Sequence, residues 1–226
     1  MDKDVENLLS RGVVEVIDKE HLKKRLLAGE KLRIKLGIDP TSPYLHLGHA
    51  VGLFTLRRFQ ELGHTVIFLV GDFTAQIGDA SDKLSKRPML TEFQIKENLK
   101  NYKKSLGKIV DLKKAEIYFN SSWLKKLTFK EVALLAETFS VQQMVARRNF
   151  KERWDKGEEI SLREFMYPLM QGYDSVAVES DLELGGFDQL FNLKAGRIIQ
   201  KHYGMKEQDI MTLKMLDGLD GRKMST

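Results

Sequence analysis

Residues 32–70, LRIKLGIDPTSPYLHLGHAVGLFTLRRFQELGHTVIFLV, decide the fold of this chain. In residues 32–38, apolar side chains alternate with basic or small ones, and this period of two is typical of a β-strand. Two prolines then interrupt the chain, and a helix is expected at about 46–62, where a glycine ends it. Residues 65–70 are a continuous apolar run of strand length, which indicates a strand covered on both faces. The order strand, helix, strand predicts a βαβ unit with a right-handed crossover.

The rest of the chain extends this unit in both directions, with apolar residues at helical or strand spacing. Helices are expected at residues 2–10, 18–28, 91–106, 161–178 and 187–202, short strands at about 117–119 and 212–215, and a long loop at 71–90. Residues 121–157 are predicted to be helical and rich in charge. We therefore expect one α/β domain, 1–226, with a Rossmann-like, mostly parallel sheet flanked by helices. A helical insertion at about 115–160 would separate its two halves.

Composition limits the classes of protein to which the chain can belong. With 226 residues, 42% of them hydrophobic, it can bury one large core. It has no cysteine, which excludes disulfides, thiolate metal sites and cysteine nucleophiles. No apolar run approaches the ~20 residues of a membrane span, and the acidic, mixed N-terminus is unlike a secretory signal. We expect a cytoplasmic protein without membrane contact. The net charge of +5 permits, but does not require, a phosphate-rich partner.

The first candidate site follows the strand predicted at 32–38. Asp39 comes directly after it, and His46, Gly48 and His49 come at the start of the next helix. In an open α/β sheet, ligands bind beyond the carboxyl ends of the strands, and the N–H groups at a helix N-terminus favour phosphate. The histidines can donate hydrogen bonds to phosphate or ribose, and Gly48 lets a flat ring approach the backbone. The alternative is an ordinary helix start with two incidental histidines.

Three polar side chains form a stripe on the helix predicted at 161–178. Spacings of four and three residues bring Tyr167, Gln171 and Asp174 to one helix face. A phenol, an amide and a carboxylate are an unusual set for a core face, so they predict a binding surface. The alternative is that all three are solvated.

Two glycine-containing segments complete the pattern. Lys223 stands in GLDGRKMS, residues 218–225, where a lysine can neutralise charge that develops on phosphates. By itself this signal is weak, because a solvated basic segment would look the same. Gly185 and Gly186 precede Asp188 and allow a ligand to approach the backbone closely. The alternative for Asp188 is an acidic residue in the first turn of a helix, where it favours the helix dipole.

These patterns occur together in a known family. HLGH and KMS resemble the two signature motifs of class I aminoacyl-tRNA synthetases, and the chain resembles bacterial tyrosyl-tRNA synthetases over essentially its whole length. The stretches that carry the resemblance are LGIDPTSPYLHLGH (36–49), LVGDFTAQIGD (69–79), YPLMQGYDS (167–175), LGGFDQLFN (184–192) and LDGRKMS (219–225). The resemblance implies a catalytic domain that activates tyrosine with ATP and transfers it to the 3′ end of tRNA(Tyr).

The resemblance also implies which residues bind tyrosine. Asp174 would accept the hydrogen of the substrate phenol, Tyr167 and Gln171 would hold the α-amino group, and Asp79 would face the same ammonium. The implied tyrosine-binding set is Lys35, Gly37, Asp79, Tyr167, Gln171, Asp174 and Gln189. A site that hydrogen-bonds a substrate hydroxyl can reject phenylalanine by ~10⁴–10⁵, so we expect no editing domain.

For ATP, the resemblance implies that Thr41 and His46 meet the γ-phosphate side, with His49 and Asp188 at the ribose. The implied ATP-binding set is Asp39, Gly48, Lys83, Arg87, Asp188, Lys223, Met224 and Ser225, and the implied catalytic residues are Thr41, His46, His49 and Lys223. Mg²⁺ would accompany ATP, and no metal site built from protein residues alone is expected.

The insertion would form the twofold interface of a homodimer. The apolar residues proposed for that interface are Phe139, Val141, Met144 and Val145, and the alternative for each of them is the internal core.

The sequence departs from the family pattern in three places. Lys35 stands where many tyrosyl enzymes carry a second tyrosine for the phenol. Ala80 and Asp82 replace a usual proline and glycine, and Thr226 replaces a lysine. We expect the chain to be the front part of a longer enzyme, without the C-terminal tRNA-binding domain. The alternatives that stay open are a tryptophanyl-type synthetase of the same fold and a non-catalytic RNA-binding protein that kept it. A small-molecule nucleotidyltransferase would give no reason for the polar stripe.

Overall fold

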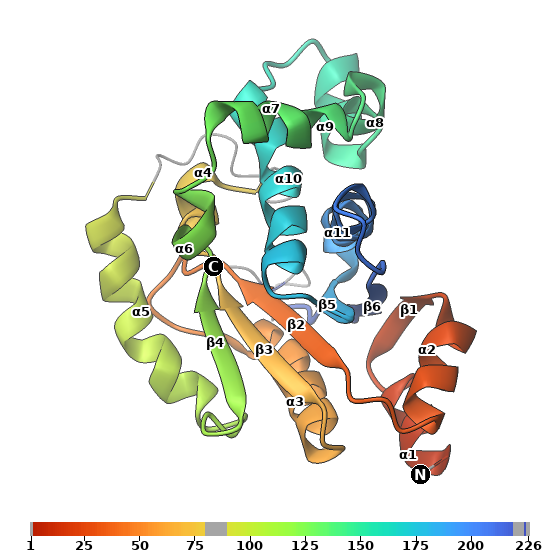
Figure 1. The fold of residues 1–226 in the computed structure, drawn as a ribbon. Helices are drawn as coiled ribbons and strands as arrows, with labels where there is room; N and C mark the ends of the chain where they lie inside the picture. Colours follow the sequence, from red (N-terminus) through yellow and green to blue (C-terminus); the bar gives the residue numbers. More distant parts are fainter. Residues whose placement is uncertain (1, 80–89, 219–223, 225–226) are drawn as a thin grey trace.

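The computed structural model describes residues 2–79, 90–218 and 224. Within these residues, six strands form one sheet in the order β1-β6-β5-β2-β3-β4 (Figure 1). The strands are β1 (Val13–Ile17), β2 (Arg33–Ile38), β3 (Thr65–Val70), β4 (Ala115–Phe119), β5 (Leu182–Gly186) and β6 (Asp209–Leu213). The edge strand β1 runs antiparallel to β6, and all the other neighbours are parallel. The predicted Rossmann-like, mostly parallel sheet is therefore confirmed.

Helices connect the strands and form the upper part of the molecule in Figure 1. They are α1 (Asp2–Leu8), α2 (Lys19–Leu27), α3 (Leu47–Glu61), α4 (Thr74–Ile77), α5 (Glu92–Leu106), α6 (Ser121–Leu124), α7 (Phe129–Glu137), α8 (Val141–Val145), α9 (Arg148–Asp155), α10 (Leu162–Ala177), the 3₁₀ turn η1 (Phe187–Gln189) and α11 (Leu190–His202). Capping boxes fix several starts, for example Thr91 with Gln94 at α5. Among the described residues, none of these helices is long and apolar enough to cross a membrane.

Helices cover both faces of the sheet. On β2, the Lys35 ammonium donates to Ser175 of α10, whereas the side chain of Leu36 lies against Gly52 of α3. Neighbouring side chains of a strand point to opposite faces, so α10 and α3 lie on opposite sides. The largest hydrophobic cluster fills the side that faces α3 and extends to α1, α2 and α5.

Four details of the fold differ from the sequence prediction. Strands β1 and β5 were not predicted, and the last strand covers Asp209–Leu213 rather than 212–215. The loop expected at 71–90 contains the short helix α4. The insertion expected at about 115–160 begins later, because Ala115–Phe119 is the edge strand β4 of the main sheet. Its helical part therefore consists of α6 to α9.

The insertion packs on α10 and α11 through a second hydrophobic cluster. The buried members of this cluster are Leu135, Met144, Leu169 and Ile199. Met144 is only 4% exposed and Phe139 packs against the same cluster, so both belong to the internal core rather than to an outer surface. Val145 is half-buried, whereas Val141 is 60% exposed. Of the four residues proposed for a dimer interface, Val141 is thus the one that is clearly presented outward.

Candidate functional site

A pocket of about 280 Å³ opens at the carboxyl ends of the central strands. Its walls come from the ends of β2, β3, β5 and β6, from the first turn of α3 and from the middle of α10. Along the chain, β2 to β4 extend the sheet to one side, and β5 and β6 extend it to the other. The pocket therefore lies at the point where the strand order reverses, which is where open α/β folds bind their ligands.

Most of the residues that the sequence singled out line this pocket. The structure brings together Gly37, Asp39, Thr41, His46, Gly48, His49, Asp79, Tyr167, Gln171, Asp174, Asp188, Gln189 and Met224. The predicted phosphate-binding residues Lys83, Arg87, Lys223 and Ser225 lie outside the described residues and stay predictions. Lys35 is described but is not part of the lining.

Helix α10 turns its polar stripe toward the pocket. Ser161 and Glu164 form a capping box at its start, which fixes where the helix begins. Tyr167 and Asp174 are buried, and Gln171 is half-buried. The alternative of a solvated stripe is therefore wrong, and these three polar groups are enclosed around the cavity.

Asp39 joins the stripe from the loop after β2. Its Oδ2 accepts a 2.9 Å hydrogen bond from the Tyr167 hydroxyl, and its Oδ1 accepts a 2.7 Å bond from the Thr74 hydroxyl. Burial is the main cause that raises the pKa of Asp39 to about 7, and the nearby carboxylates of Asp79 and Asp174 add to the shift. The pocket thus concentrates acidic groups, which favours a ligand that carries a positive charge.

Asp174 is held by two donors from the segment after β4. Its Oδ1 accepts a 2.7 Å hydrogen bond from Trp123 Nε1, and its Oδ2 accepts a 3.2 Å bond from Asn120 Nδ2. Burial raises the pKa of Asp174 to about 7, while the Lys35 ammonium lowers it. A carboxylate has about four lone-pair positions, so this one is fixed in place and can still accept from a ligand. The sequence prediction missed both donors, which lie more than 50 residues earlier in the chain.

Asp79 accepts hydrogen bonds from donors on separate segments of the chain. Its Oδ1 lies 3.0 Å from Arg147 Nη2, and its Oδ2 accepts hydrogen bonds from Gln189 Nε2 at 2.8 Å and Asn192 Nδ2 at 3.4 Å. Arg147 comes from the turn between α8 and α9, so the insertion contributes a cation to the edge of the pocket. No local pattern predicted this contact, because 68 residues separate Arg147 from Asp79.

The two histidines form the start of helix α3. Nδ1 of His46 accepts a 3.0 Å hydrogen bond from the N–H of Gly48, and Nδ1 of His49 accepts a 3.2 Å bond from the N–H of His46. When Nδ1 is the acceptor, a neutral ring carries its proton on Nε2, so each ring is also a donor. A Cβ at residue 48 would lie 2.7 Å from Cε1 of His46, so any side chain there would displace the His46 ring. The histidines therefore have a structural role as helix caps, at a helix start that lines the pocket.

The opposite wall is formed where β5 ends. A Cβ at residue 186 would lie 2.5 Å from Oδ1 of Asp188, so the carboxylate lies directly over the bare backbone of Gly186. Both residues line the pocket. The close backbone approach predicted for the paired glycines is thus made by a side chain of the protein itself.

Lys35 requires a correction. The sequence assigned it to the tyrosine-binding set, but its side chain is fully buried and faces α10. Its ammonium lies 2.9 Å from Oε1 of Glu183 and does not reach the lining. Glu183 does line the pocket, although the sequence prediction passed over it. No motif pointed to Glu183, because it lies close to two glycines in a strand that was not predicted.

Comparisons with known proteins point to one family. A family model described as tRNA synthetases class I (W and Y) matches residues 27–226. Over 96% of its length, the chain is 51% identical to a tyrosine–tRNA ligase from Thermotoga maritima, of which the match covers 55%. It is 50% identical over its whole length to the ligase from Oleidesulfovibrio alaskensis, of which 57% is covered. The chain thus spans about half the length of the curated relatives it matches.

A solved structure gives the same indication. The tyrosyl-tRNA synthetase from Archaeoglobus fulgidus, determined in complex with L-tyrosine, superimposes with a TM-score of 0.81 at 27% identity. The match covers 100% of this chain and 68% of that one.

Proposed function

The chain belongs to the class I tRNA synthetases of the tryptophanyl and tyrosyl type, and from this premise we propose that it activates tyrosine with ATP and charges tRNA(Tyr). The observation that carries the proposal is the buried carboxylate of Asp174, held at the pocket by Trp123 and Asn120. A phenol can donate to it, whereas phenylalanine would leave it without that hydrogen bond. The names of the relatives at 51% and 50% identity support tyrosine over tryptophan.

The other end of the substrate would meet the acidic part of the pocket. The Tyr167 hydroxyl donates to Asp39, so its oxygen offers lone pairs to an ammonium rather than a competing proton. Asp79 adds a carboxylate, and Gln171 adds an amide. The charges of Asp39 and Asp79 favour the α-ammonium of an amino acid over a neutral analogue.

ATP would bind between the start of α3 and the end of β5. The Nε2 protons of His46 and His49 and the N-terminal end of α3 are suited to phosphate oxygens. Asp188, placed over the backbone of Gly186, is suited to ribose hydroxyls. Thr41 would lie on the γ-phosphate side. The predicted phosphate ligands are Lys83, Arg87, Lys223 and Ser225.

The reaction would proceed without a protein nucleophile. A carboxylate oxygen of tyrosine attacks the α-phosphorus of ATP, the bond to the β-phosphate oxygen breaks, and pyrophosphate leaves with the Mg²⁺ that entered with ATP. A hydroxyl at the 3′ end of tRNA then attacks the tyrosyl carbonyl and displaces AMP. The pocket would act by holding the reactants in line and by stabilising charge on the phosphates.

ATP–pyrophosphate exchange measured with each amino acid in turn tests this function. We expect exchange with tyrosine and none with phenylalanine or tryptophan. Exchange that prefers tryptophan would identify the alternative synthetase. If there is no exchange and calorimetry detects no ATP binding, the chain is a non-catalytic protein with this fold. Aminoacylation of tRNA(Tyr) is the separate test of the second step.

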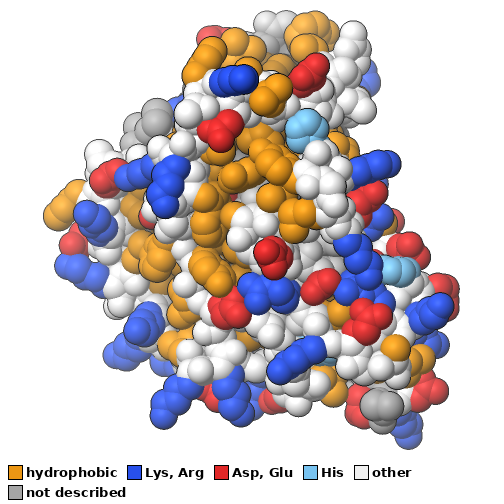
Figure 2. All heavy atoms as spheres, viewed as in Figure 1, with side chains coloured by type: hydrophobic (Ala, Val, Ile, Leu, Met, Phe, Trp, Pro, Cys, Tyr) orange, Lys and Arg blue, Asp and Glu red, His pale blue; other side chains and the backbone are white. Residues whose placement is uncertain are grey.

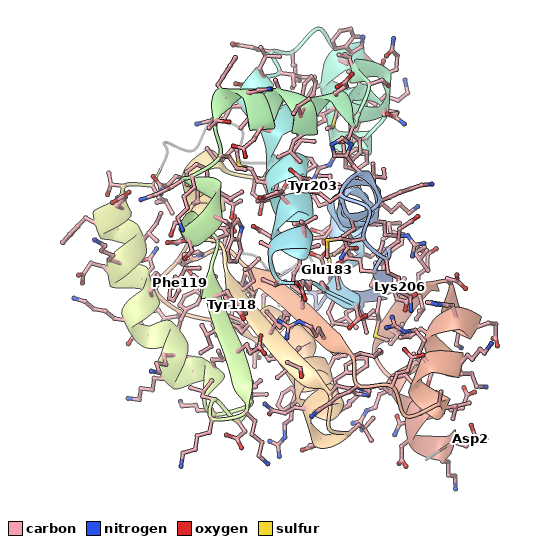
Figure 3. All side chains as sticks on the ribbon, viewed as in Figure 1. Asp2, Tyr118, Phe119, Glu183, Tyr203 and Lys206 are labelled. Carbon is pink, nitrogen blue, oxygen red and sulfur yellow. The ribbon has the colours of Figure 1, made fainter. Side chains whose placement is uncertain are left out.

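We also propose that the protein is cytoplasmic and forms a homodimer through the insertion and its surroundings. Figure 2 shows hydrophobic side chains gathered on the face that carries α10 and the insertion. Phe129 is 90% exposed, and Phe119 and Tyr203, labelled in Figure 3, are also exposed. Large apolar side chains at the surface are typical of an interface. Sedimentation of the Phe129→Glu variant should show monomers where the unmodified chain shows dimers, and an unchanged mass would place the interface elsewhere.

A further inference from the structure

Strands β2 and β5 and helix α10 enclose an ion pair next to the pocket. Lys35 and Glu183 face each other in the parallel register of the two strands, and their side chains are 0% and 1% exposed. Lys35 Nζ lies 2.9 Å from Glu183 Oε1, and it donates to Ser175 Oγ at 2.7 Å and to the backbone oxygen of Gln171 at 3.1 Å. The three N–H donors of the ammonium therefore have three acceptors.

The carboxylate of Glu183 collects donors from three further groups. Its Oε1 accepts a 3.1 Å hydrogen bond from Gln171 Nε2, and its Oε2 accepts from Ser175 Oγ at 3.1 Å and from Gln208 Nε2 at 2.5 Å. Figure 3 labels Glu183 in the region where β5, α10 and α11 meet. In each of these contacts the carboxylate is the acceptor.

An ionised carboxylate can only accept hydrogen bonds. Gln171 therefore has to present its NH₂ group to Glu183, and its amide oxygen is turned away from that carboxylate. Gln171 lines the pocket, where an amide oxygen is an acceptor and an NH₂ group would be a donor. The acceptor oxygen of Glu183 thereby decides which of the two the pocket offers.

We propose that Lys35 and Glu183 are positioning residues that fix the amide of Gln171 with its oxygen available to the α-ammonium of the amino-acid substrate. This inference rests on the proposed function of the pocket. Lys35 holds this arrangement through its ion pair with Glu183 Oε1, the same oxygen that accepts from Gln171 Nε2. Without the ammonium, that oxygen would lose its ion-pair partner, and the carboxylate would no longer be held opposite the NH₂ group of Gln171. Lys35 thus acts through two other side chains and does not touch the ligand.

A purely structural ion pair would also be costly to remove, so stability alone cannot test the proposal. Two ligands separate the roles: L-tyrosine, and 3-(4-hydroxyphenyl)propanoate, which has the same phenol and carboxylate but no α-ammonium. The Glu183→Gln variant keeps the shape of the side chain but lets Gln171 bind it in either orientation. Calorimetry on the 1–226 chain gives Kd for both ligands.

We expect Glu183→Gln to raise Kd for L-tyrosine by about tenfold or more, the effect of losing one hydrogen bond to a charged group. Kd for 3-(4-hydroxyphenyl)propanoate should stay unchanged, because that ligand makes no use of the amide oxygen. An equal loss for both ligands, or no loss for L-tyrosine, would overturn the proposal. An unmodified chain that binds neither ligand would instead overturn the proposed function, and this inference with it.

Ser175→Ala is the matched control. It removes the hydrogen bond to the other oxygen of Glu183 and one acceptor of the Lys35 ammonium, but it leaves both the Lys35–Glu183 ion pair and the partner of the Gln171 amide in place. We expect a lower Tm with an unchanged ratio of the two Kd values. If the ratio of Kd for L-tyrosine to Kd for 3-(4-hydroxyphenyl)propanoate rises as far as in Glu183→Gln, general loosening of the site explains both variants and the proposal is wrong.

Lys35→Met tests whether Lys35 acts on Gln171 through Glu183. Lys35 also lowers the pKa of Asp174, but both ligands carry the phenol and share that effect. Lys35→Met should therefore raise the ratio of Kd for L-tyrosine to Kd for 3-(4-hydroxyphenyl)propanoate, and the ratio in the double variant Lys35→Met/Glu183→Gln should be no higher than in Glu183→Gln alone, since Lys35 acts on the Gln171 side chain through Glu183. Additive effects on this ratio would mean that Lys35 acts on the ligand by another route and would contradict the proposal. If Lys35→Met fails to fold, the comparison of Glu183→Gln with Ser175→Ala still tests the proposal.

Discussion

The indole N–H of Trp123 donates a 2.7 Å hydrogen bond to Oδ1 of Asp174 and thereby ties α6 to the polar stripe of α10. This bond lowers the pKa of a carboxyl that burial raises to about 7. Asp174 therefore titrates near neutral pH, and the fraction that is ionised depends on Trp123. A phenol donates well to the ionised form, whereas a protonated carboxyl offers a weaker acceptor.

Trp123→Phe should shift the pH dependence of tyrosine activation. In the unmodified chain, kcat/KM for tyrosine in pyrophosphate exchange should rise as Asp174 ionises at about pH 7. Without the indole donor the pKa of Asp174 is higher, so the rise should move to higher pH, with a large loss below neutrality and a smaller one above it. Trp154→Phe, at the exposed tryptophan of α9, is the control and should keep the original profile. Parallel profiles for the two variants would refute the link.

Asp174→Asn should weaken the selection of tyrosine. One hydrogen bond between a buried charged group and the substrate hydroxyl contributes roughly 1.5–3 kcal/mol, so kcat/KM for tyrosine should fall by about ten- to a hundredfold. Discrimination against phenylalanine should fall with it, because the penalty for an unpaired carboxylate disappears. The measurement is pyrophosphate exchange with both amino acids, and unchanged tyrosine kinetics would refute the assignment of Asp174.

The same substitution should stabilise the ligand-free protein at high pH. Burial raises the pKa of Asp174 from 3.8 to about 7, so between these values the folded state binds a proton that the unfolded chain has lost. The free energy of unfolding therefore decreases as the pH rises through this window. A shift of about three pKa units corresponds to at most about 4 kcal/mol of stability that the substitution can recover. Weaker hydrogen bonds from Trp123 and Asn120 to the amide reduce this gain. Urea unfolding should show a higher free energy of unfolding for Asp174→Asn than for the unmodified chain at pH 8, and a much smaller difference at pH 5. An equal difference at both pH values would show that the ionisation of Asp174 is not its cause.

Two substitutions can separate the role of His46 as a helix cap from its proposed role as a donor to phosphate. His46→Ala removes the cap of α3, at a cost of about 1 kcal/mol, and should also lower the rate of activation by ~10²–10³, as expected for a lost donor to developing charge. His46→Asn restores a side-chain acceptor for the N–H of Gly48, so it should recover Tm but not the rate. Tyrosine affinity should be similar in both variants. Recovery of the rate by asparagine would show that the histidine acts only as a cap.

The local parts of the fold could be predicted from the sequence, and the long-range parts could not. Helix α3 and strand β3 followed from apolar period, prolines and a terminal glycine. Strand β5 was missed because LELGG has one charged residue and two glycines in five, a composition that indicates a turn. It is a strand because β2 and β6 pair with it on its two sides. The pocket could be assembled from motifs on separate segments, because strand ends in a parallel sheet share one edge.

The contacts that tune the site lay beyond sequence reasoning. Trp123 and Asn120 reach Asp174 from the segment after β4, and Arg147 reaches Asp79 from the insertion. No periodicity relates residues that meet only through tertiary packing. The resemblance assigned Lys35 to the ligand by its position in β2, and only the register of β2 with β5 reveals its pairing with Glu183.

The sheet order also determines when the pocket can form during synthesis. Strand β2 pairs on one side with β3, the next strand in the chain, but on its other side with β5, where the backbone N–H of Arg33 already bonds to Asp181 across 148 residues. Contacts of such separation form late and slow folding. While a ribosome extends the chain, β2 to β4 can associate early, but the open edge of β2 and the unpaired Lys35 must wait for β5. That exposed edge is where a nascent chain would be most prone to wrong pairing, and where a chaperone would be of most use.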